Sequence, residues 1–302
     1  MDKREQWGRP KARRLRELIA QGTVVVPGAF NALTAMQIER AGFEAVYVSG
    51  AGLAASRGLP DIGLLSMTEV VSDAGTVANA VAIPALADAD TGYGPPLSVM
   101  RTVQAFEQGG LAGIHLEDQA DPKQCGHLEG KRLVAVSEMA QKIAAATAAR
   151  HDPDFLIVAR TDARAVEGLG AAVKRARAYV DAGADVIFPE ALESPEEFRS
   201  FAQGLAKAGA TVPLVANMTE FGKTPYLSVS EFEVLGYRLV LFPVMALRVA
   251  TKAVEAMLGE LKSLGTQQKS LDKMLTRQQL YDLLGYAAYE KRADDLRNRY
   301  GR

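Results

Sequence analysis

Cysteine is almost absent from this sequence, because Cys125 is the only one among 302 residues. A single cysteine cannot form an internal disulfide bond, which is typical of a protein in a reducing compartment. The amino-terminal residues MDKREQWGRP contain no apolar run like that of a signal peptide. We therefore expect a cytoplasmic protein.

Charge of one sign and long apolar segments are also missing. The formal net charge is -1, so no overall field attracts nucleic acid or an acidic membrane surface. The longest apolar runs, such as AVAIPALA from Ala80, are too short to span a bilayer. The composition, 48% hydrophobic and 24% charged, is ordinary for a globular protein. We expect a small-molecule substrate and no nucleic-acid or membrane partner.

Glycine, in contrast, is plentiful and recurs where a helical pattern gives way to an apolar run. AGFEAVYVSG from Ala41 and AGADVIFPE from Ala182 are two instances. Glycine provides the left-handed residue that ends a helix, and the apolar run begins the next strand. With similar runs that lack the glycine, the pattern predicts eight strands. They start near Thr23, Ala45, Pro84, Ala112, Phe155, Asp185, Pro213 and Arg238.

Helical patterns separate these runs, so the fold class is α/β with parallel strands joined by right-handed crossovers. Ser194 followed by Pro195, for example, indicates a helix start. Eight such units predict a (β/α)8 TIM barrel. A doubly wound open sheet is the alternative, but no G-x-G-x-x-G follows the first strand.

The carboxyl-terminal residues exceed what a barrel needs. Residues 246–265 have the pattern of an amphipathic helix, and further helical residues extend to Arg302. We expect one domain, residues 1–302, with residues 246–302 as a helical extension. Its apolar stripe would dock on the barrel or on a neighbouring subunit.

Acidic residues gather at the predicted carboxyl ends of two neighbouring strands, the catalytic end of such a barrel. Asp88 and Asp90 are two residues apart on one strand, and Glu117 ends the next. Carboxylates that converge repel one another unless a cation is present, and hard oxygen ligands favour Mg2+ over Zn2+. Alternatively, these acids cap helices or pair with Arg160.

Other strand ends carry further candidates. Arg160 could bind a substrate carboxylate through its planar guanidinium, or form an ion pair across the barrel mouth. Asn217 and Thr219 are suited to hydrogen bonds with a polar ligand, although both are also common in turns. His115 is interpreted as a structural residue and His151 as a solvent-facing one.

The segment KQCGHLEGK from Lys123 contains the cysteine in a polar, glycine-flanked setting that does not look like a core. A free cysteine is usually a small buried hydrophobic residue, but cationic neighbours lower a thiol pKa and favour its chemistry. Two long connections, this one and AGLAASRGLPDIGLLS from Ala51, are predicted at the catalytic end, where long loops often act as lids.

Eight segments together resemble the isocitrate lyase and phosphoenolpyruvate mutase superfamily. They are SGAG, GLPDIG, ADADTGYG, HLEDQ, KQCGHLEGK, ARTDA, FPEA and NMTEFGKTP. The resemblance extends from about Gly22 to LTRQQLY near the carboxyl terminus. It implies a (β/α)8 barrel whose eighth helix is exchanged between subunits, usually in a homotetramer.

The resemblance also implies a set of site residues. Mg2+, or Mn2+ in its place, would be held by Asp88, with Asp61, Asp90 and Glu117 as further direct or water-mediated contacts. An α-keto acid portion would contact Ser49, Gly50, Ala51 and Arg160, and the rest of the substrate Glu190, Asn217, Thr219, Arg248 and Arg277. Cys125, Gly126 and His127 would lie on a closing loop. Two positions depart from the family pattern: Gln124, where a basic residue is usual, and Ala51, where glycine is frequent.

The implied reaction is cleavage of 2-methylisocitrate to succinate and pyruvate, a step of the methylcitrate cycle in propionate catabolism. Cys125 would deliver a proton to the succinate fragment, and Tyr47 is the candidate base for the substrate hydroxyl. Phe188, Leu241 and Pro243 would line the pocket for the extra methyl group. The alternatives are a lyase for a 2-alkylmalate such as dimethylmalate, an oxaloacetate hydrolase, and a binding barrel without chemistry.

Overall fold

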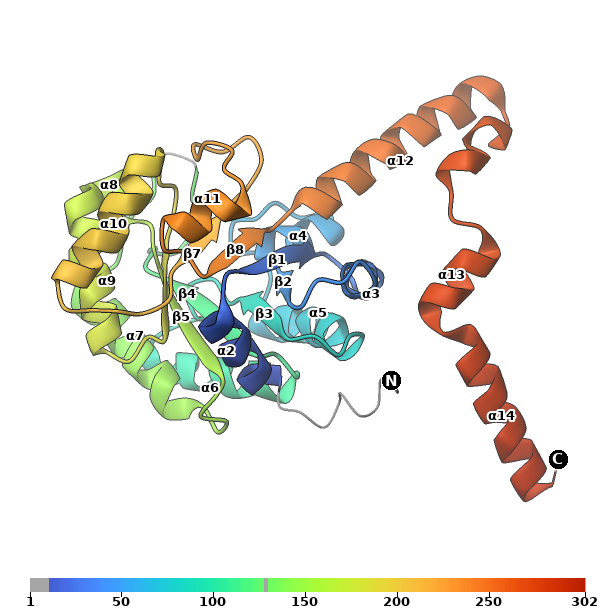
Figure 1. Cartoon of the computed structure of the whole chain (residues 1–302), viewed down its shortest axis with the longest axis horizontal. Coiled ribbons are helices and arrows are strands. Elements are labelled where there is room, and N and C mark those ends of the chain that lie inside the picture. Colours follow the sequence, from blue (N-terminus) through green and yellow to red (C-terminus); the bar gives the residue numbers. More distant parts are fainter. Residues whose placement is uncertain (1–10, 128–129, 302) are drawn as a thin grey trace. The chain divides into compact units, whose positions relative to one another are not determined.

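The computed structural model of the chain describes residues 11–127 and 130–301. Eight parallel strands form one sheet in the order β6-β5-β4-β3-β2-β1-β8-β7 (Figure 1). A parallel bridge between Ile187 and Leu214 links the two outer strands, which closes the sheet. The (β/α)8 barrel is therefore confirmed, and the open sheet is excluded. The strands are β1 (Val24–Ala29), β2 (Val46–Val48), β3 (Ala85–Asp88), β4 (Gly113–Glu117), β5 (Leu156–Thr161), β6 (Val186–Pro189), β7 (Val215–Asn217) and β8 (Leu239–Phe242).

The predicted strand starts agree closely with the observed ones. The largest difference is at β7, where Pro213 was expected and Val215 begins the strand. Proline has no N–H to donate to a ladder, so the regular pairing starts after it. Short apolar runs bounded by glycine or proline thus locate the strands of this chain.

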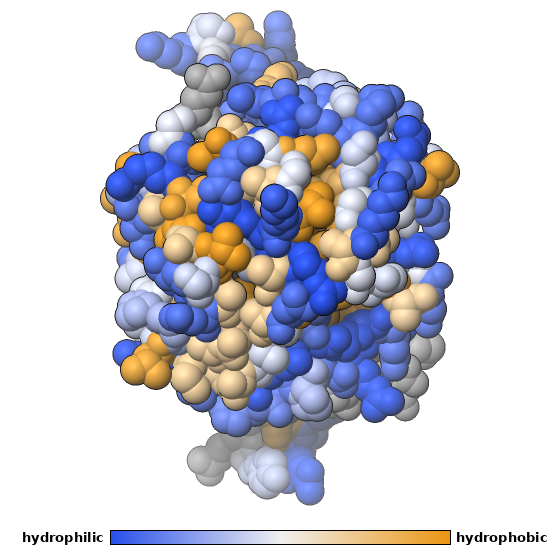
Figure 2. All heavy atoms as spheres, turned by 90° about the vertical axis from the view of Figure 1, so that its left-hand side faces the viewer, coloured by the Kyte–Doolittle hydropathy of each residue, from blue (hydrophilic) through white to orange (hydrophobic). Residues whose placement is uncertain are grey.

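Helices surround the sheet and bury one face each against it (Figure 1). The Ser194 side chain accepts a hydrogen bond from the Glu197 N–H at 3.2 Å, so the predicted helix start is confirmed. Figure 2 shows hydrophilic side chains around a group of apolar ones on the outer face of α8–α10. The helices of this part are α2 (Lys11–Gln21), α3 (Ala32–Arg40), α4 (Gly50–Ser56), α5 (Met67–Asn79), α6 (Pro96–Gln108), α7 (Val136–Ala149), α8 (Ala163–Glu167), α9 (Leu169–Asp181), α10 (Pro195–Lys207) and α11 (Val229–Val234).

A second core lies inside the barrel. Alternate strand residues, among them Leu86, Val158, Phe188 and Leu241, pack together with apolar residues of α2 such as Leu15. Side chains of a strand point to opposite faces in turn, so every second residue faces the interior. Helix α2 therefore covers the amino-terminal end of the barrel, and the interior side chains become polar only toward the opposite end.

The contacts divide the chain into two units, one up to Ala246 and one from Leu247 on. The second unit contains α12 (Met245–Leu264) from its third residue on, a 3-10 helix (Gln268–Lys273), α13 (Arg277–Leu284) and α14 (Tyr286–Tyr300). No residue of α12 is buried, and its apolar Val249, Val254 and Leu258 are exposed. Among the described residues, no helix has the length and apolar composition needed to cross a bilayer.

Candidate active site

The interior alternation of the strands brings polar side chains together at their carboxyl ends. On five of the strands, the interior side chain at the carboxyl end is polar, whereas the interior side chain two residues earlier is apolar or, in one case, a histidine. The pairs are Leu86 and Asp88, His115 and Glu117, Val158 and Arg160, Phe188 and Glu190, and Val215 and Asn217. The register places Asp88 beside His115, and Glu117 beside Arg160. Parallel pairing thus converts five separate sequence positions into one polar layer.

Asp88 and Asp90 lie together, but not as two residues of one strand face, so that detail of the prediction is wrong. Strand β3 ends at Asp88, and Asp90 follows it in the left-handed conformation with φ 48°. The turn lets the Asp90 N–H donate to Asp88 Oδ1 at 3.0 Å. The Gly50 N–H donates to the other oxygen, Oδ2, at 3.2 Å. A Cβ on Gly50 would come within 2.8 Å of Asp88 Oδ2, so this approach requires glycine.

Lys123 extends from the cysteine segment into the acidic cluster. Its Nζ lies 2.5 Å from Asp61 Oδ1 and 2.6 Å from Asp90 Oδ1, and the side chain is 4% exposed. Burial alone would lower the pKa of Lys123, but the surrounding carboxylates, Asp88 and Asp90 above all, raise it instead. From the sequence, Lys123 was considered only as a cationic neighbour of Cys125. Its contact with Asp61 and Asp90 was not predicted.

The pKa values of the acids in the cluster are shifted in different directions. Burial would raise the pKa of Asp88, yet His115, Lys123 and Arg160 outweigh it and hold that pKa at about 2. Burial and then the charge of Asp88 raise the pKa of Asp90 to about 6. Burial also raises the pKa of Glu117 well above its usual range. Within one cluster, the pKa of Asp88 is therefore lowered, whereas those of Asp90 and Glu117 are raised, both mainly by burial.

The donor chemistry of this cluster fits a hard divalent cation. Four carboxylates, those of Asp61, Asp88, Asp90 and Glu117, supply the oxygen ligands that Mg2+ prefers. Glu117 Oε1 is buried and has no hydrogen-bond partner among the described residues. No three His, Cys, Asp or Glu side chains of the described chain are already arranged around a common metal position. The Lys123 ammonium contacts two of the four acids.

Arg160 is buried among acidic side chains. Its Nε and Nη2 donate to Asp162 Oδ2 at 3.0 Å and to Oδ1 at 3.2 Å. Nε also lies 3.4 Å from Glu117 Oε2 and 3.8 Å from Glu190 Oε2. The ion pairs that the sequence offered as one interpretation of Arg160 are therefore present. Asp162, which the sequence analysis did not single out, fixes the plane of the guanidinium.

Tyr47 and His115 form a buried pair inside the barrel. The Tyr47 hydroxyl lies 2.7 Å from His115 Nε2, which is itself 3.4 Å from Asp88 Oδ1. Burial, followed by the charge of Asp88, raises the pKa of Tyr47 well above its usual value. The edge of the His115 ring meets Phe188 with centroids 5.4 Å apart. His115 thus belongs to the polar cluster, which its interpretation as a purely structural residue did not include.

The cysteine segment lies against Arg160 and Glu190. A Cβ on Gly126 would come within 2.4 Å of Glu190 Cγ and 2.5 Å of Arg160 Nη2. His127 Nε2 lies 3.0 Å from Glu190 Oε1, and its Nδ1 accepts a hydrogen bond from the Lys223 N–H at 3.0 Å. Cys125 itself is exposed. Leu128 and Glu129 of the same motif lie outside the described residues.

The remaining candidates fall into four groups. Ser49 is the N-cap of α4, where its side chain accepts from the Gly52 N–H at 3.4 Å, and Ala51 follows in that helix. Asn217 donates to Glu190 Oε1 at 3.2 Å, whereas Thr219 lies two residues beyond β7.

The apolar candidates lie deeper in the barrel or next to it. Phe188 and Leu241 belong to the interior core, and Pro243 directly follows β8. Arg248, in α12, and Arg277, which begins α13, belong to the second unit, and their contact with the substrate stays a prediction.

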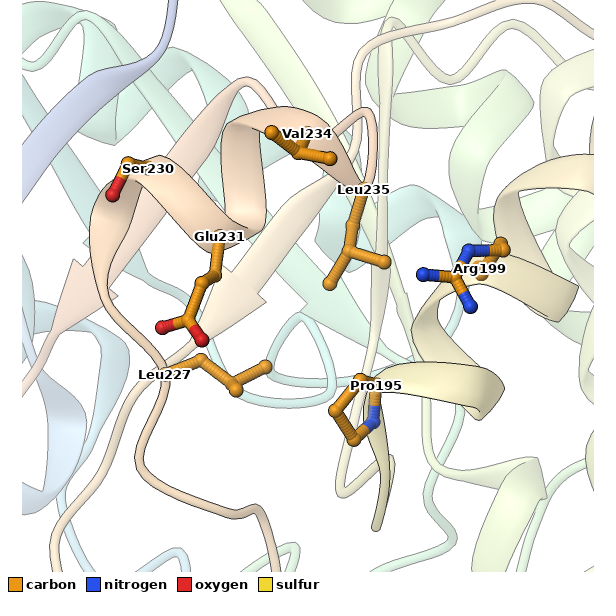
Figure 3. Close-up of a pocket in the computed structure, with 7 residues that line it drawn as sticks. All are labelled: Pro195, Arg199, Leu227, Ser230, Glu231, Val234 and Leu235. Carbon is orange, nitrogen blue, oxygen red and sulfur yellow. The ribbon is translucent and has the colours of Figure 1, made fainter.

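A separate hollow of about 340 Å³ opens between α10 and α11 (Figure 3). Its lining contains none of the strand-end residues described above. The wall is formed by Pro195 and Arg199 on one side and by Leu227, Ser230, Glu231, Val234 and Leu235 on the other. Its few polar groups do not converge, so we place the chemistry at the strand ends.

Comparison with known proteins gives consistent matches over most of the chain. Residues 15–262 match the family described as phosphoenolpyruvate phosphomutase. The 2-methylisocitrate lyase of Aeropyrum pernix is 51% identical over 92% of this chain and 88% of its own. That of Bacillus subtilis is 48% identical over 92% and 91%. The 2,3-dimethylmalate lyase of Eubacterium barkeri is 45% identical over 91% and 94%.

Solved structures match with similar coverage. A 2,3-dimethylmalate lyase superposes with a TM-score of 0.87 at 38% identity, over 94% of both chains. An oxaloacetate acetylhydrolase in complex with 3,3-difluorooxalacetate has a TM-score of 0.88 at 34% identity, over 97% of both chains. A phosphonopyruvate hydrolase in complex with oxalate and Mg2+ has a TM-score of 0.86 at 32% identity, over 97% of this chain and 100% of the other.

Proposed function

The chain belongs to the phosphoenolpyruvate phosphomutase family, and from this premise we propose that it is a Mg2+-dependent carbon–carbon lyase. The proposed reaction is cleavage of 2-methylisocitrate to succinate and pyruvate, as a cytoplasmic step of propionate catabolism. Two relatives named for this reaction are 51% and 48% identical to the chain, each over 92% of its length. The observation that carries the proposal is the strand-end cluster of Asp88, Glu117 and Arg160 with the cysteine segment against it.

Asp88, Asp90, Asp61 and Glu117 would hold the cation, directly or through water. When bound, Mg2+ would act as a Lewis acid on the oxygens of the α-hydroxy acid and lower the pKa of its hydroxyl. Glu117 supports this assignment, because its buried Oε1 has no hydrogen-bond partner among the described residues. Lys123 would neutralise the part of the acidic charge that a divalent cation leaves.

Arg160 would bind a substrate carboxylate with the guanidinium edge that Asp162 does not use. Ser49, Gly50 and Ala51 would orient the part of the substrate that becomes pyruvate, since Gly50 already adjoins Asp88. The remaining carboxylates and the hydroxyl of the substrate would be contacted by six residues: Glu190, Asn217, Thr219, His127, Arg248 and Arg277. The Glu190 contacts to Asn217 and His127 support their common use.

Two proton movements are required in the cleavage. Because the raised pKa of Tyr47 keeps its hydroxyl protonated, that hydroxyl would act as a relay: it would take the proton of the substrate hydroxyl while it passes its own proton to His115 Nε2. The carbon–carbon bond then breaks, and the succinate fragment leaves as an enediolate. Cys125 would supply the proton that this fragment needs, with the segment around Gly126 excluding water.

A 2-alkylmalate is the second candidate substrate, because a 2,3-dimethylmalate lyase is 45% identical and another superposes with a TM-score of 0.87. Both substrates present a hydroxyl, adjacent carboxylates and a methyl group. Phe188, Leu241 and Pro243 would contact that methyl in either case. The distinction therefore depends on how many carboxylates the site holds.

The exposed apolar residues of the second unit support a proposal for assembly. Val249, Val254 and Leu258 of α12, and Leu284 of α13, are exposed within a single copy. We propose that this unit packs on a second copy in a homotetramer with exchanged helices. Light scattering on the purified protein tests this, and a monomer at micromolar concentration would rule it out.

The decisive experiment compares kcat/KM for 2-methylisocitrate, isocitrate, 2,3-dimethylmalate and oxaloacetate at one Mg2+ concentration, with the products identified. Release of pyruvate and succinate from 2-methylisocitrate as the best substrate is expected. If dimethylmalate or oxaloacetate is preferred by about tenfold or more, which is about 1.4 kcal/mol in transition-state free energy, the family stands but the named reaction is wrong.

A further inference from the structure

Lys131 is a buried lysine whose position the reaction chemistry does not explain. Its side chain is 1% exposed, and its Nζ donates to the Gly126 carbonyl oxygen and lies 3.2 Å from Asp162 Oδ1. Burying an ammonium group is costly unless it is paired and hydrogen-bonded, so this position must contribute something that an apolar side chain would not. The two acceptors show what that contribution is.

The first acceptor is the peptide next to the cysteine. Gly126 lies between Cys125 and His127, and its Cα packs so closely on Arg160 and Glu190 that a side chain would not fit. The base of the segment is also held, by the Gln119–Leu133 bridge and by a 2.9 Å hydrogen bond from the Gln124 N–H to Gln119 Oε1. At the tip, the His127 side chain contacts Glu190 and the Lys223 N–H, and Lys131 adds the contact to the Gly126 backbone carbonyl.

The second acceptor is the carboxylate that orients Arg160. Asp162 accepts both hydrogen bonds from the Arg160 guanidinium, at 3.0 and 3.2 Å. Its own N–H donates to Asp118 Oδ1 at 2.9 Å, which fixes Asp162 to the barrel. One carboxylate therefore holds the guanidinium proposed to bind substrate and the lysine that holds the cysteine segment.

We propose that Lys131 is a positioning residue that holds the Cys125–His127 segment against Arg160 and Glu190 through Asp162. It does not contact the substrate, because its ammonium is enclosed by protein. Its effect on turnover rests on the proposed function, in which Cys125 delivers a proton. Its effect on the segment does not depend on any substrate.

Lys131→Met tests this, since methionine keeps the apolar stem and removes the charged donor. Lys11→Met is the matched control, because Lys11 also donates to backbone carbonyls, that of Val81 at 2.8 Å, but lies on α2 at the other end of the barrel. Amide hydrogen exchange of residues 119–127 is measured in both variants and in the unaltered protein. Strand β5 serves as the internal reference.

In Lys131→Met, exchange across residues 119–127 should accelerate by about tenfold or more while β5 stays unchanged. A misplaced catalytic group costs about 10²-fold, so kcat should fall by that order while KM changes by less than about threefold. Lys11→Met should change neither. If Lys131→Met does not fold, Lys131→Gln, which keeps a shorter neutral donor, is measured in its place.

Unchanged exchange in residues 119–127, or kcat no lower than in the Lys11→Met control, would overturn the proposal. Faster exchange with unaltered kcat would also overturn it, because Lys131 would then be only structural. If the unaltered protein cleaves no 2-hydroxy acid of the substrate panel, the proposed function fails. The exchange comparison then still decides whether Lys131 holds the segment.

Discussion

The hydroxyl of Tyr47 and Nε2 of His115 lie 2.7 Å apart inside the barrel, where both side chains are buried. Their rings are nearly parallel, with an angle of 17° and centroids 5.9 Å apart. His115 also lies 3.4 Å from Asp88 Oδ1, so the pair connects the interior of the barrel with the acidic cluster. The Tyr47 hydroxyl can therefore pass its own proton to the imidazole when it accepts one from a bound molecule.

Tyr47→Phe removes this hydroxyl and keeps the buried ring. Because general base catalysis typically contributes about 10²–10⁴-fold, kcat for 2-methylisocitrate should fall within that range. Tyr237→Phe is the matched control, since its buried hydroxyl donates to the Phe198 carbonyl at 3.2 Å, away from the cluster. Each variant should lose about 0.5–1.5 kcal/mol of stability with its hydrogen bond. Equal kcat in the two variants would exclude Tyr47 as the base.

The metal assignment predicts that Asp88→Asn loses turnover and Mg2+ binding together. The amide keeps one oxygen, so it can accept the N–H of either Gly50 or Asp90 and loses the other hydrogen bond, at about 0.5–1.5 kcal/mol, which the fold should tolerate. Excess chelator should abolish the turnover of the unaltered protein, and Mg2+ or Mn2+ should restore it. Calorimetric titration of Mg2+ provides a readout that does not depend on activity. Full activity in excess chelator would remove the metal from the mechanism.

Cys125→Ser should abolish proton delivery, because serine has a similar size but is a far weaker acid. Turnover should fall by about 10²–10⁴-fold while substrate binding persists. The thiol is exposed and is the only one in the chain, so alkylation of the unaltered protein gives an independent test. A serine variant with nearly unaltered turnover would mean that another group donates the proton.

Much of this site follows from alternation and parallel pairing alone. Asp88, Glu117 and Arg160 end apolar runs at interior positions, so knowledge of a barrel is enough to predict that they converge. Lys123 and Lys131 could not be placed in this way. Both come from a connection without regular repeats, and only its folded path shows that their long side chains reach Asp61 and Asp162.

The contacts of His115 could not be predicted for a different reason. It alternates with Glu117 on β4, which already indicates that both face the interior. A histidine there is ambiguous, because an imidazole can equally fill a core or bond to a polar partner. The partner, Tyr47, lies on β2, two strands away around the barrel. Whether the two side chains meet depends on the curvature of the sheet and on the length of each side chain. Arg248 and Arg277 remain predictions, since they belong to the second unit.

Gly126→Ala should reduce activity more than stability. Its Cβ would lie 2.4 Å from Glu190 Cγ and 2.5 Å from Arg160 Nη2, so the segment would have to move away from both. Such a displacement should lower kcat by about 10²-fold. Gly170→Ala is the control, because a Cβ there meets nothing within 4 Å and α9 should gain about 0.5–1 kcal/mol. Activity of Gly126→Ala equal to this control would show that the contact is dispensable.

Substrate choice gives the last prediction. The methyl of 2-methylisocitrate is on the carbon that bears the hydroxyl, so it becomes the methyl of pyruvate. A pocket shaped for one methyl group gains about 1–3 kcal/mol, or about 10–200-fold in kcat/KM over isocitrate. We place this pocket near Phe188, Leu241 and Pro243. Phe188 is 1% exposed and its ring faces the Arg160 guanidinium at 5.3 Å.

Phe188→Trp should therefore fill the space of the methyl and lower kcat/KM for 2-methylisocitrate more than for isocitrate. Any buried Phe→Trp change also overpacks a core, at a cost of about 1–3 kcal/mol in stability. Phe201→Trp separates the two effects, because Phe201 is 0% exposed in the core beneath α10, outside the barrel interior. It should lower the melting temperature and leave the ratio of the two kcat/KM values unchanged. The same ratio in both variants would place the methyl pocket elsewhere, because the loss would then come from overpacking alone.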